Sequence, residues 1–280
     1  KHRIPKFKIG YFYSELGKDR VAKLLQDGVL IEGLDGRGPF TEQDLAKTDK
    51  MVLMAGVHPF IKLLDMGADV IIGGRAGDVC PFAAVGIREG FPEALSYHMG
   101  KLLECASFCA EPYGAKETVL GTISHHDIKV TAMHPNQRCT IASVAGHSMY
   151  ERSNPFYEYF TGGMIDLTEC KYEQYDAKTT RVTGAKYVPA TTLRAKLEGA
   201  GKVGERYVGM AGIRDPYSIR NIEGVVRWAR DQVRAKYGDT GYQLFYHIYG
   251  RNAIMRELEP VSEIRSQELC LVVEGIAPTH

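Results

Sequence analysis

Apolar residues in the first part of the chain alternate between short unbroken runs and stretches with helical spacing. Residues 69–72 (Asp-Val-Ile-Ile) are almost wholly apolar, which predicts a strand covered on both faces. Residues 79–88 and 94–109 have helical spacing and are separated by a Gly-Phe-Pro break. With a further strand expected at residues 6–13, the order predicts an α/β lobe with parallel strands.

Local signals place several helix boundaries in this lobe. Residues 41–44 (Thr-Glu-Gln-Asp) resemble a capping box that opens a helix. Pro59 suits the first turn of the next helix, because proline there loses no helical hydrogen bond. Residues 19–25 place three apolar side chains on one helical face, and Gly28 can end that helix.

The pattern changes after residue 117. Residues 118–189 are rich in Tyr, Thr and Val between frequent turns, which predicts short, mostly antiparallel strands. Residues 140–152 interrupt them with helical spacing. Further on, a strand is expected at 207–213 and a helix at 217–236, followed by strands at 244–249 and 269–274.

The fold class expected is therefore α/β in two lobes. Residues 1–117 form a parallel-sheet, Rossmann-like lobe, which we expect to be incomplete at its N-terminus because the first strand has no neighbour before it. Residues 118–280 form an α+β lobe with mixed and antiparallel strands.

Charge and composition exclude several classes of function. The chain has 35 Lys and Arg against 34 Asp and Glu, so a nucleic-acid or anionic-membrane partner is not expected. No run of 18 apolar residues predicts a spanning helix. The six cysteines are scattered without a CxxC pair, which is typical of reduced thiols in a cytoplasmic protein.

The strongest candidate site follows the strand at 69–72. Gly73 and Gly74 allow a sharp turn and close approach of the backbone to a ligand. Arg75 can hold a carboxylate or phosphate in a two-pronged contact, and Asp78 can orient it or move a proton. The alternative is that Arg75 and Asp78 pair with each other, or that Asp78 caps the following helix.

Helix 94–109 carries a second candidate. Glu104 lies among apolar neighbours, a setting that suits a catalytic acid or base. Cys105 and Cys109 share a face with His98, but buried cysteines most often pack as small hydrophobic groups, and that interpretation is favoured.

A third group lies in residues 134–147. Asn136 and Arg138 follow a rigid His-Pro turn and can grip a polar substrate, with His147 as a proton carrier. A plain turn with a hydrogen-bonded histidine is an equal alternative. The adjacent histidines at 125 and 126 point to opposite faces of a strand, so a turn or surface position is favoured over a metal site. Asp215 is interpreted as a helix cap.

Phosphate-binding signatures are absent: the chain has neither a G-x-G-x-x-G nor a G-x-x-x-x-G-K-[ST] motif, so a dinucleotide or nucleoside triphosphate has little support. The cofactor stays unknown, and a metal assembled from distant Asp, Glu and His residues stays open.

The chain resembles the acyclic terpene utilisation (AtuA-like) family of bacterial proteins. The resemblance rests on GADVIIGGRAGD (67–78), HMGKLLECA (98–106), HPNQRC (134–139), SVAGHSMYE (143–151), GGMIDLTECKYE (162–173), KLEGAGKVGERYVGMAGIRDP (196–216) and FYHIYGRNAIMRELEP (245–260). It implies a protein of pathways that degrade branched acids and acyl-CoA esters, and a carbon–oxygen or carbon–carbon lyase. Members of the family carry a further Gly-rich α/β segment upstream and more chain downstream, so we expect either a fragment or a partner that supplies strands.

These observations lead to one leading function and one alternative. The leading prediction is a cytoplasmic lyase or hydratase of a small carboxylate or its CoA ester. In it, Arg75 and Arg138 hold anionic groups, and Asp78, Glu104 or His147 move the proton of an enolate-like intermediate. The alternative is a non-catalytic binding subunit of a larger acyl-CoA-processing complex. A homo-oligomer or a hetero-complex is expected.

Overall fold

The computed structural model describes residues 6–34, 36–113, 118–239 and 241–278. The chain divides into two compact units, unit 1 (Lys1–Gly201) and unit 2 (Lys202–His280). The lobe boundary expected at residue 117 lies outside the described residues. Elements on either side of it share a core, because Leu102 of the preceding helix packs with Val130 of a following strand.

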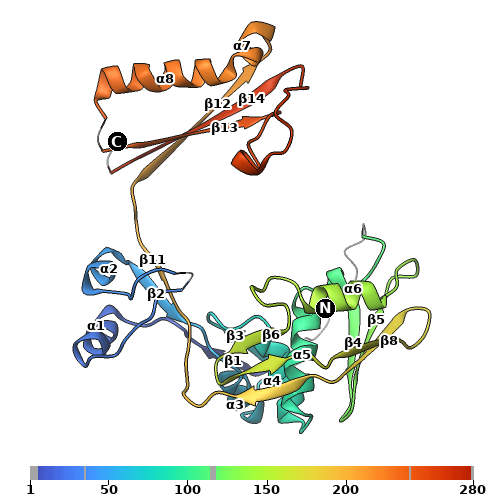
Figure 1. The fold of residues 1–280 in the computed structure, drawn as a ribbon. Coiled ribbons are helices and arrows are strands. Elements are labelled where there is room, and N and C mark those ends of the chain that lie inside the picture. Colours follow the sequence, from blue (N-terminus) through green and yellow to red (C-terminus); the bar gives the residue numbers. More distant parts are fainter. Residues whose placement is uncertain (1–5, 35, 114–117, 240, 279–280) are drawn as a thin grey trace. The chain divides into compact units, whose positions relative to one another are not determined.

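A two-stranded parallel ribbon stands at the start of unit 1 (Figure 1). β1 (Ile9–Phe12) pairs with β3 (Val70–Gly73), and α3 (His58–Asp65) contacts both strands. The ring of Phe12 meets that of Phe60 edge to face, with centroids 5.1 Å apart. The strand predicted at 69–72 is present as β3, but the prediction that both of its faces are covered is wrong, because Val70 and Ile72 are exposed.

The wider Rossmann-like parallel sheet is not confirmed. Within the described residues, β1 and β3 form the only parallel ladder. The next strand, β2 (Lys50–Leu53), pairs antiparallel with β11 (Leu197–Ala200), from far along the chain. A partner so distant in sequence leaves no trace in the local apolar pattern. The fold is mixed α/β, with mostly antiparallel sheets.

The ribbon face away from α3 is apolar and exposed. Paired residues of the two strands point the same way, so Tyr11 and Ile72 lie side by side on this face, 64% and 60% exposed. The neighbouring pair of Ile9 and Val70 is also exposed. Parallel strands are normally covered on both faces, so this surface departs from the usual arrangement.

Helices α4 (Cys80–Arg88) and α5 (Glu93–Glu104) pack against each other very closely. A Cβ atom at Gly100 would lie 2.5 Å from the Val79 backbone oxygen, and one at Gly86 would lie 2.5 Å from Ser96 Oγ. Only glycine permits this approach. It brings the last turns of α5 beside the start of α4 and the loop that follows β3.

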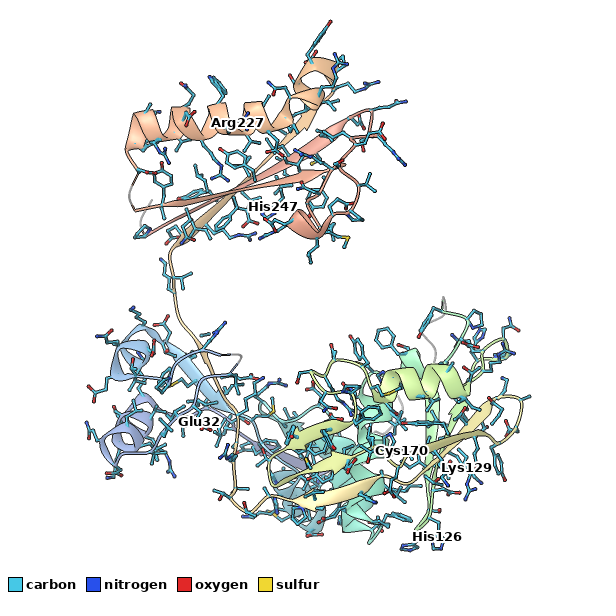
Figure 2. The ribbon with its side chains drawn as sticks, in the orientation of Figure 1. Glu32, His126, Lys129, Cys170, Arg227 and His247 are labelled. Atoms are coloured by element: carbon cyan, nitrogen blue, oxygen red, sulfur yellow. The ribbon has the colours of Figure 1, made fainter. Side chains whose placement is uncertain are left out.

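Antiparallel sheets complete the main core of unit 1, as expected for residues 118–189. A four-stranded sheet has the order β4 (Val119–Ile123), β5 (Ile128–Ala132), β9 (Thr179–Thr183), β8 (Lys171–Gln174). Helix α5 contacts β4 and β5, and α6 (Ile141–Ser148) contacts β8. A three-stranded sheet has the order β10 (Lys186–Pro189), β7 (Gly163–Asp166), β6 (Tyr157–Phe160). His126 lies in the β4–β5 turn (Figure 2), as the turn interpretation predicted.

A smaller cluster in unit 1 joins α1 (Lys18–Gln26) and α2 (Glu42–Lys47) to the β2–β11 pair. Val21, Leu45 and Met51 are its buried members. The predicted capping box is confirmed: the Asp44 backbone N–H donates to Thr41 Oγ1, and the Thr41 backbone N–H donates to the Asp44 carboxylate.

Unit 2 is a three-stranded antiparallel sheet with two helices. Its strand order is β12 (Glu205–Ile213), β14 (Leu269–Ala277), β13 (Gln243–Tyr249). Ile219 of α7 (Pro216–Arg220) and Ile222 of α8 (Ile222–Tyr237) pack with sheet residues such as Leu271 in its core. The predicted cap is confirmed, because Asp215 accepts from the Ser218 backbone N–H at 2.7 Å.

Candidate functional site

The loop after β3 is held against residues 12–14. A Cβ atom on Gly73 would lie 2.8 Å from the Phe12 ring, and one on Gly74 would lie 2.6 Å from Ser14 Oγ. Both glycines line a cavity. The close approach that requires glycine here is to the chain's own residues.

Arg75 is held by carboxylates from two directions. Its guanidinium donates to Glu198 of β11 at 3.0 and 3.3 Å and to Asp78 at 3.0 Å. The hydrogen bonds to Glu198, followed by those to Asp78, raise the pKa of Arg75 despite its partial burial. The pairing of Arg75 with Asp78, which the sequence analysis gave as the alternative to ligand binding, is present. This cluster is part-exposed, with Arg75 35% and Asp78 65% exposed.

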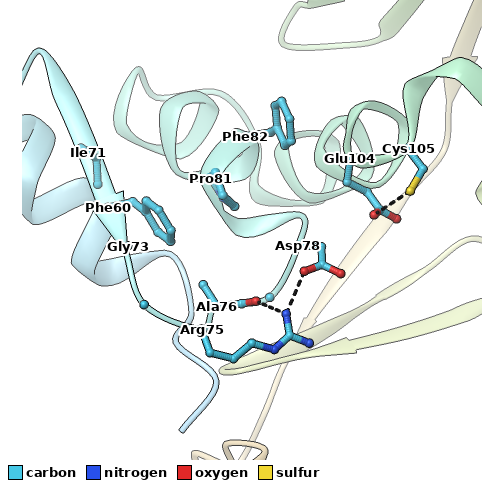
Figure 3. A pocket seen from close by; sticks show the side chains of 12 residues that line it. Phe60, Ile71, Gly73, Arg75, Ala76, Asp78, Pro81, Phe82, Glu104 and Cys105 are labelled. Atoms are coloured by element: carbon cyan, nitrogen blue, oxygen red, sulfur yellow. Dashed lines mark hydrogen bonds and ion pairs between the residues drawn. The ribbon is translucent and has the colours of Figure 1, made fainter. Parts of the chain in front are cut away.

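A cavity of about 730 Å³ opens beside this loop. One part of its wall is apolar and comes from Phe60, Ile71, Pro81 and Phe82. Figure 3 shows Phe60, Pro81 and Phe82 to one side of the Asp78 and Glu104 carboxylates, with Arg75 below them. Pockets of this size and mixed lining are typical of small-molecule sites.

The last turns of α5 place a buried ion pair at the cavity. Lys101 Nζ lies 2.6 Å from Glu104 Oε1, and the two side chains are only 5% and 10% exposed. Their spacing of three residues puts both on one face of the helix. Cys105 Sγ donates to the other Glu104 oxygen at 3.4 Å. Glu104 is therefore held by two donors at an edge of the cavity.

A second cavity, of about 440 Å³, shares part of this wall. Arg75, Gly77, Asp78 and Glu104 line both cavities, and Lys101 lines the second. The loop after α6 and strand β6 add a second buried ion pair, Arg152 to Glu158 at 2.5 Å.

Burial opposes the charges of this second pair. It lowers the pKa of Arg152, and the Glu158 charge counteracts the shift. It raises the pKa of Glu158, and the Arg152 charge counteracts that shift. Glu151, on the same wall, has a left-handed backbone conformation (φ 62°) that non-glycine residues seldom adopt.

His147 lies near the ion pairs but lines neither cavity. Its ring is buried and packs against the rings of Phe108 and Tyr150. Burial, followed by the Lys101 charge, lowers the pKa of His147. Both effects favour the neutral form of the ring.

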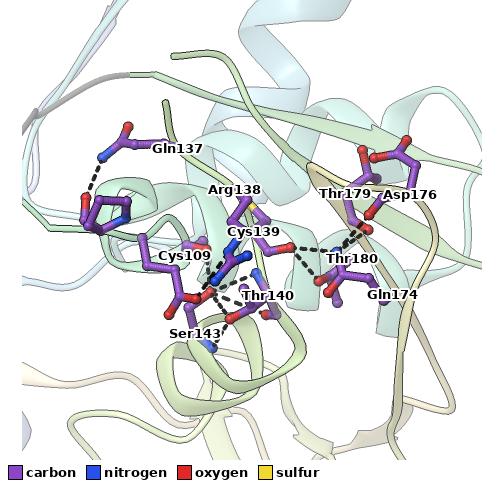
Figure 4. Close-up of polar contacts among 12 residues, drawn as sticks. Cys109, Gln137, Arg138, Cys139, Thr140, Ser143, Gln174, Asp176, Thr179 and Thr180 are labelled. Carbon is purple, nitrogen blue, oxygen red and sulfur yellow. Dashed lines mark hydrogen bonds and ion pairs between the residues drawn. The ribbon is translucent and has the colours of Figure 1, made fainter. Parts of the chain in front are cut away.

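Asn136 and Arg138 also line neither cavity. Arg138 pairs with Glu111, and the Asn136 backbone N–H donates to the His134 ring. The next residue, Cys139, anchors the segment through its carbonyl, which accepts from Gln174 and Thr180 (Figure 4). These contacts explain the segment as a structural junction between α6 and the four-stranded sheet.

The thiols of the cysteines in and around the core favour the protonated form. Burial raises the pKa of Cys80 to about 11 and that of Cys170 to about 12. Burial and the hydrogen bond to Glu104 also raise the pKa of Cys105. These shifts disfavour a thiolate nucleophile. Among the described residues, no group of three or more His, Cys, Asp and Glu side chains is placed to hold a metal ion.

Of the residues that the sequence singles out, Arg75, Asp78 and Glu104 line the same cavities, whereas Lys101, Arg152 and Glu158 were not among the predicted site residues. Lys101 carried a readable signal, since it is the one charge in the apolar stretch YHMGKLL and has Glu104 three residues later. Arg152 and Glu158 have no such local signal, because their burial depends on the tertiary fold that brings the loop after α6 beside β6.

Fold and site define the chain as a mixed α/β protein with a two-part cavity, at which Glu104 lines both parts and its buried partner Lys101 lines the smaller one. Comparison with known families then identifies it more closely. The chain belongs to the acyclic terpene utilisation family: the family model described as acyclic terpene utilisation family protein AtuA matches residues 1–280, the whole chain. No curated protein and no solved structure matches it. In the part of the chain that the structure describes, no helix has the length and apolar character needed to cross a membrane.

Proposed function

We propose that the chain is a lyase or hydratase that acts on a branched carboxylate or its CoA ester through proton transfer at the Lys101–Glu104 pair. One observation carries this proposal: a carboxylate and an ammonium group, both almost fully buried, face a cavity large enough for a small molecule. Buried ionisable groups in a cleft are typical of acid–base sites. Membership of the acyclic terpene utilisation family is consistent with branched hydrocarbon substrates.

Glu104 is the proposed base. It removes a proton from the carbon next to the substrate carbonyl, so the C–H bond breaks and its electron pair moves onto the carbonyl oxygen. The Lys101 ammonium, beside Glu104, stabilises the negative charge on that oxygen. The enolate electron pair then forms the double bond to the neighbouring carbon while the bond from that carbon to its hydroxyl breaks, and the hydroxyl takes the proton from Glu104 and departs as water, which restores the Glu104 carboxylate. The Asp78 carboxylate, on the shared wall and paired with Arg75, is proposed to accept a hydrogen bond from that hydroxyl and so to orient it.

The other predicted residues take supporting roles in this proposal. Arg75 holds the loop through Glu198 and Asp78, so we assign it to positioning Asp78 more than to gripping a free anion. His147 lines neither cavity, so we assign it a packing role near the end of α5 and no part in proton transfer. Asn136 and Arg138 are left out of the mechanism for the same reason.

Hydrogen–deuterium exchange tests the proton-transfer step without knowledge of the complete reaction. A panel of branched carboxylates and their CoA esters is incubated with the protein in D₂O, and loss of the C2 proton signal is followed by NMR. We expect exchange with at least one branched compound and its loss in Glu104→Gln, which retains shape but cannot accept the proton.

Glu173→Gln is the matched control, because Glu173 is also a carboxylate in unit 1 that pairs with a cation, but it is exposed and lines neither cavity. It should exchange at the wild-type rate. Equal exchange by wild type and Glu104→Gln would contradict the proposal, as would no exchange by wild type with any compound.

A second candidate function is a subunit role, favoured by the exposed apolar face of the β1–β3 ribbon. Because parallel strands are normally covered by helices, the partner we propose is a polypeptide that lays a helical layer over Tyr11 and Ile72. Native mass spectrometry of the protein purified from its own source would reveal the partner. Substituting Tyr11→Glu and Ile72→Glu should dissociate it without unfolding the chain, whereas a native mass equal to one chain would contradict the subunit role.

A further inference from the structure

The two cavities that meet at Glu104 differ in the chemistry of their remaining walls. The larger has the apolar surface of Phe60, Ile71, Pro81 and Phe82. The smaller also has apolar residues such as Met54 and Phe160, but it alone carries the Lys101–Glu104 and Arg152–Glu158 pairs, with hydroxyl and amide groups from the loop after α6. Groups that line both, including Asp78 and Glu104, stand at the junction.

We propose that the site binds an amphipathic molecule in one orientation, with its polar head in the smaller cavity, its hydrocarbon tail in the larger one and the carbon between them beside Glu104. Burial favours this orientation, because a hydrocarbon tail gains free energy for each methylene removed from water. The reverse orientation would place the hydrocarbon tail against two buried ion pairs. It is unfavourable because the charged groups would then lose contact with water and other polar groups. Only the choice of the reacting carbon rests on the function proposed above; the orientation rests on the two walls.

Phe82 is the proposed residue that sets tail length. It belongs to the apolar wall, and Figure 3 shows its ring beyond Pro81 on the far side of Asp78 from Arg75. Its side chain is 41% exposed, so substitution should change the cavity with little effect on folding. Phe156 is a matched control, since it is 43% exposed and lines neither cavity.

Calorimetric titration of the full chain with straight-chain alkanoates tests the orientation. Butanoate, pentanoate, hexanoate, octanoate and decanoate carry the same head and differ only in tail length. We expect Kd to fall by up to about fourfold per methylene until the larger cavity is filled, and then to level off. Phe82→Trp should move the levelling point to a shorter acid and Phe82→Ala to a longer one, while Phe156→Ala should leave the series unchanged.

The head end is tested with the same series. Arg152→Gln combined with Glu158→Gln removes both charges, so no buried charge is left without its partner. We expect this variant to weaken every acid by a similar factor and to leave the levelling point in place. A shift of the levelling point would contradict the assignment of the head to the smaller cavity.

Failure of the orientation differs from failure of the proposed function. A series without chain-length dependence, Phe82 variants identical to wild type, or no binding by any alkanoate at millimolar concentration would each overturn the orientation. Chain-length-dependent binding without C2 exchange would leave the orientation standing and contradict the proton-transfer function.

Discussion

The Arg75 cluster and the Lys101–Glu104 pair stand on the same cavity wall and use the same chemistry, yet their surroundings differ. Arg75 and Asp78 are 35% and 65% exposed, whereas Lys101 and Glu104 are 5% and 10% exposed. Water screens the first cluster and is nearly excluded from the second, where each charge depends on its partner. The comparison indicates that burial, more than residue type, distinguishes an ion-pair cluster that holds a loop in place from ionisable groups suited to acid–base chemistry.

The largest effect should come from breaking the buried pair. Glu104→Ala leaves the Lys101 ammonium buried without its carboxylate, and we expect unfolding free energy to fall by about 3–5 kcal/mol. The double variant Lys101→Met with Glu104→Leu removes both charges and should recover most of that loss while still lacking C2 exchange. Urea denaturation of the three proteins measures the difference. If the double variant has the same free energy of unfolding as Glu104→Ala, the instability of the single variant does not come from an unpaired buried charge, and the prediction is contradicted.

The next effect concerns His98, three residues before Lys101 on α5. Its ring is fully buried beside Ser148 Oγ at 2.9 Å, and burial, followed by the Arg152 charge, lowers its pKa from 6.5 to about 3. As the pH falls below 6.5, this histidine takes up a proton in the unfolded chain but stays neutral in the folded chain. The free energy of unfolding therefore decreases toward pH 3, by up to about 1.4 kcal/mol per pH unit.

Thermal denaturation between pH 7 and pH 4.5 measures this loss. We expect His98→Gln to be less stable than wild type at pH 7 but to lose less stability on acidification. The exposed His126, changed to Gln, serves as the control and should follow the wild-type pH curve. Parallel curves for His98→Gln and wild type would contradict the neutral buried ring.

A smaller effect is expected at the exposed cluster. Arg75→Ala removes its contacts with Glu198 and Asp78, and because part-exposed ion pairs contribute little, we expect a loss of about 1 kcal/mol or less. Its effect on C2 exchange should be well below that of Glu104→Gln. Denaturation midpoints and exchange rates measured side by side would sharpen the comparison. If Arg75→Ala folds but its C2 proton exchange is as slow as that of Glu104→Gln, the exposed cluster would be as necessary for proton transfer as the buried pair, which would contradict the comparison.

The smallest effect is expected in residues 134–138. Asn136→Ala and Arg138→Ala should leave alkanoate binding at the wild-type level, because neither residue lines a cavity. Isothermal titration with hexanoate checks this. Weakened binding by Arg138→Ala would return that residue to the anion-binding role that the sequence indicated.

Local signals in the sequence predicted much of the fold. The Thr41 capping box, the helix start around Pro59, the Asp215 cap and the short antiparallel strands after residue 118 are all present, because each depends on neighbouring residues. The β2–β11 pairing was not predictable in this way, since its strands are separated by most of unit 1. It replaces the extended parallel sheet that the apolar pattern indicated.

The candidate site shows the same division between residues that have a local sequence signal and residues that only the tertiary packing brings together. Arg75 and Asp78 could be singled out because they follow two glycines at the end of an apolar strand, where open α/β sheets often bind ligands. Glu104 was predictable from its apolar neighbours. Lys101 has a local signal as the one charge in an apolar stretch, but its place beside the cavity depends on the close α4–α5 packing that Gly86 and Gly100 permit.

The most direct test of the central claim is a crystal structure of the full chain with bound octanoate. The account predicts the carboxylate within hydrogen-bonding distance of Lys101 or Arg152, the chain passing Glu104 and the tail against Phe82. A carboxylate held instead by Arg138, or a tail directed toward the Arg152–Glu158 pair, would contradict it.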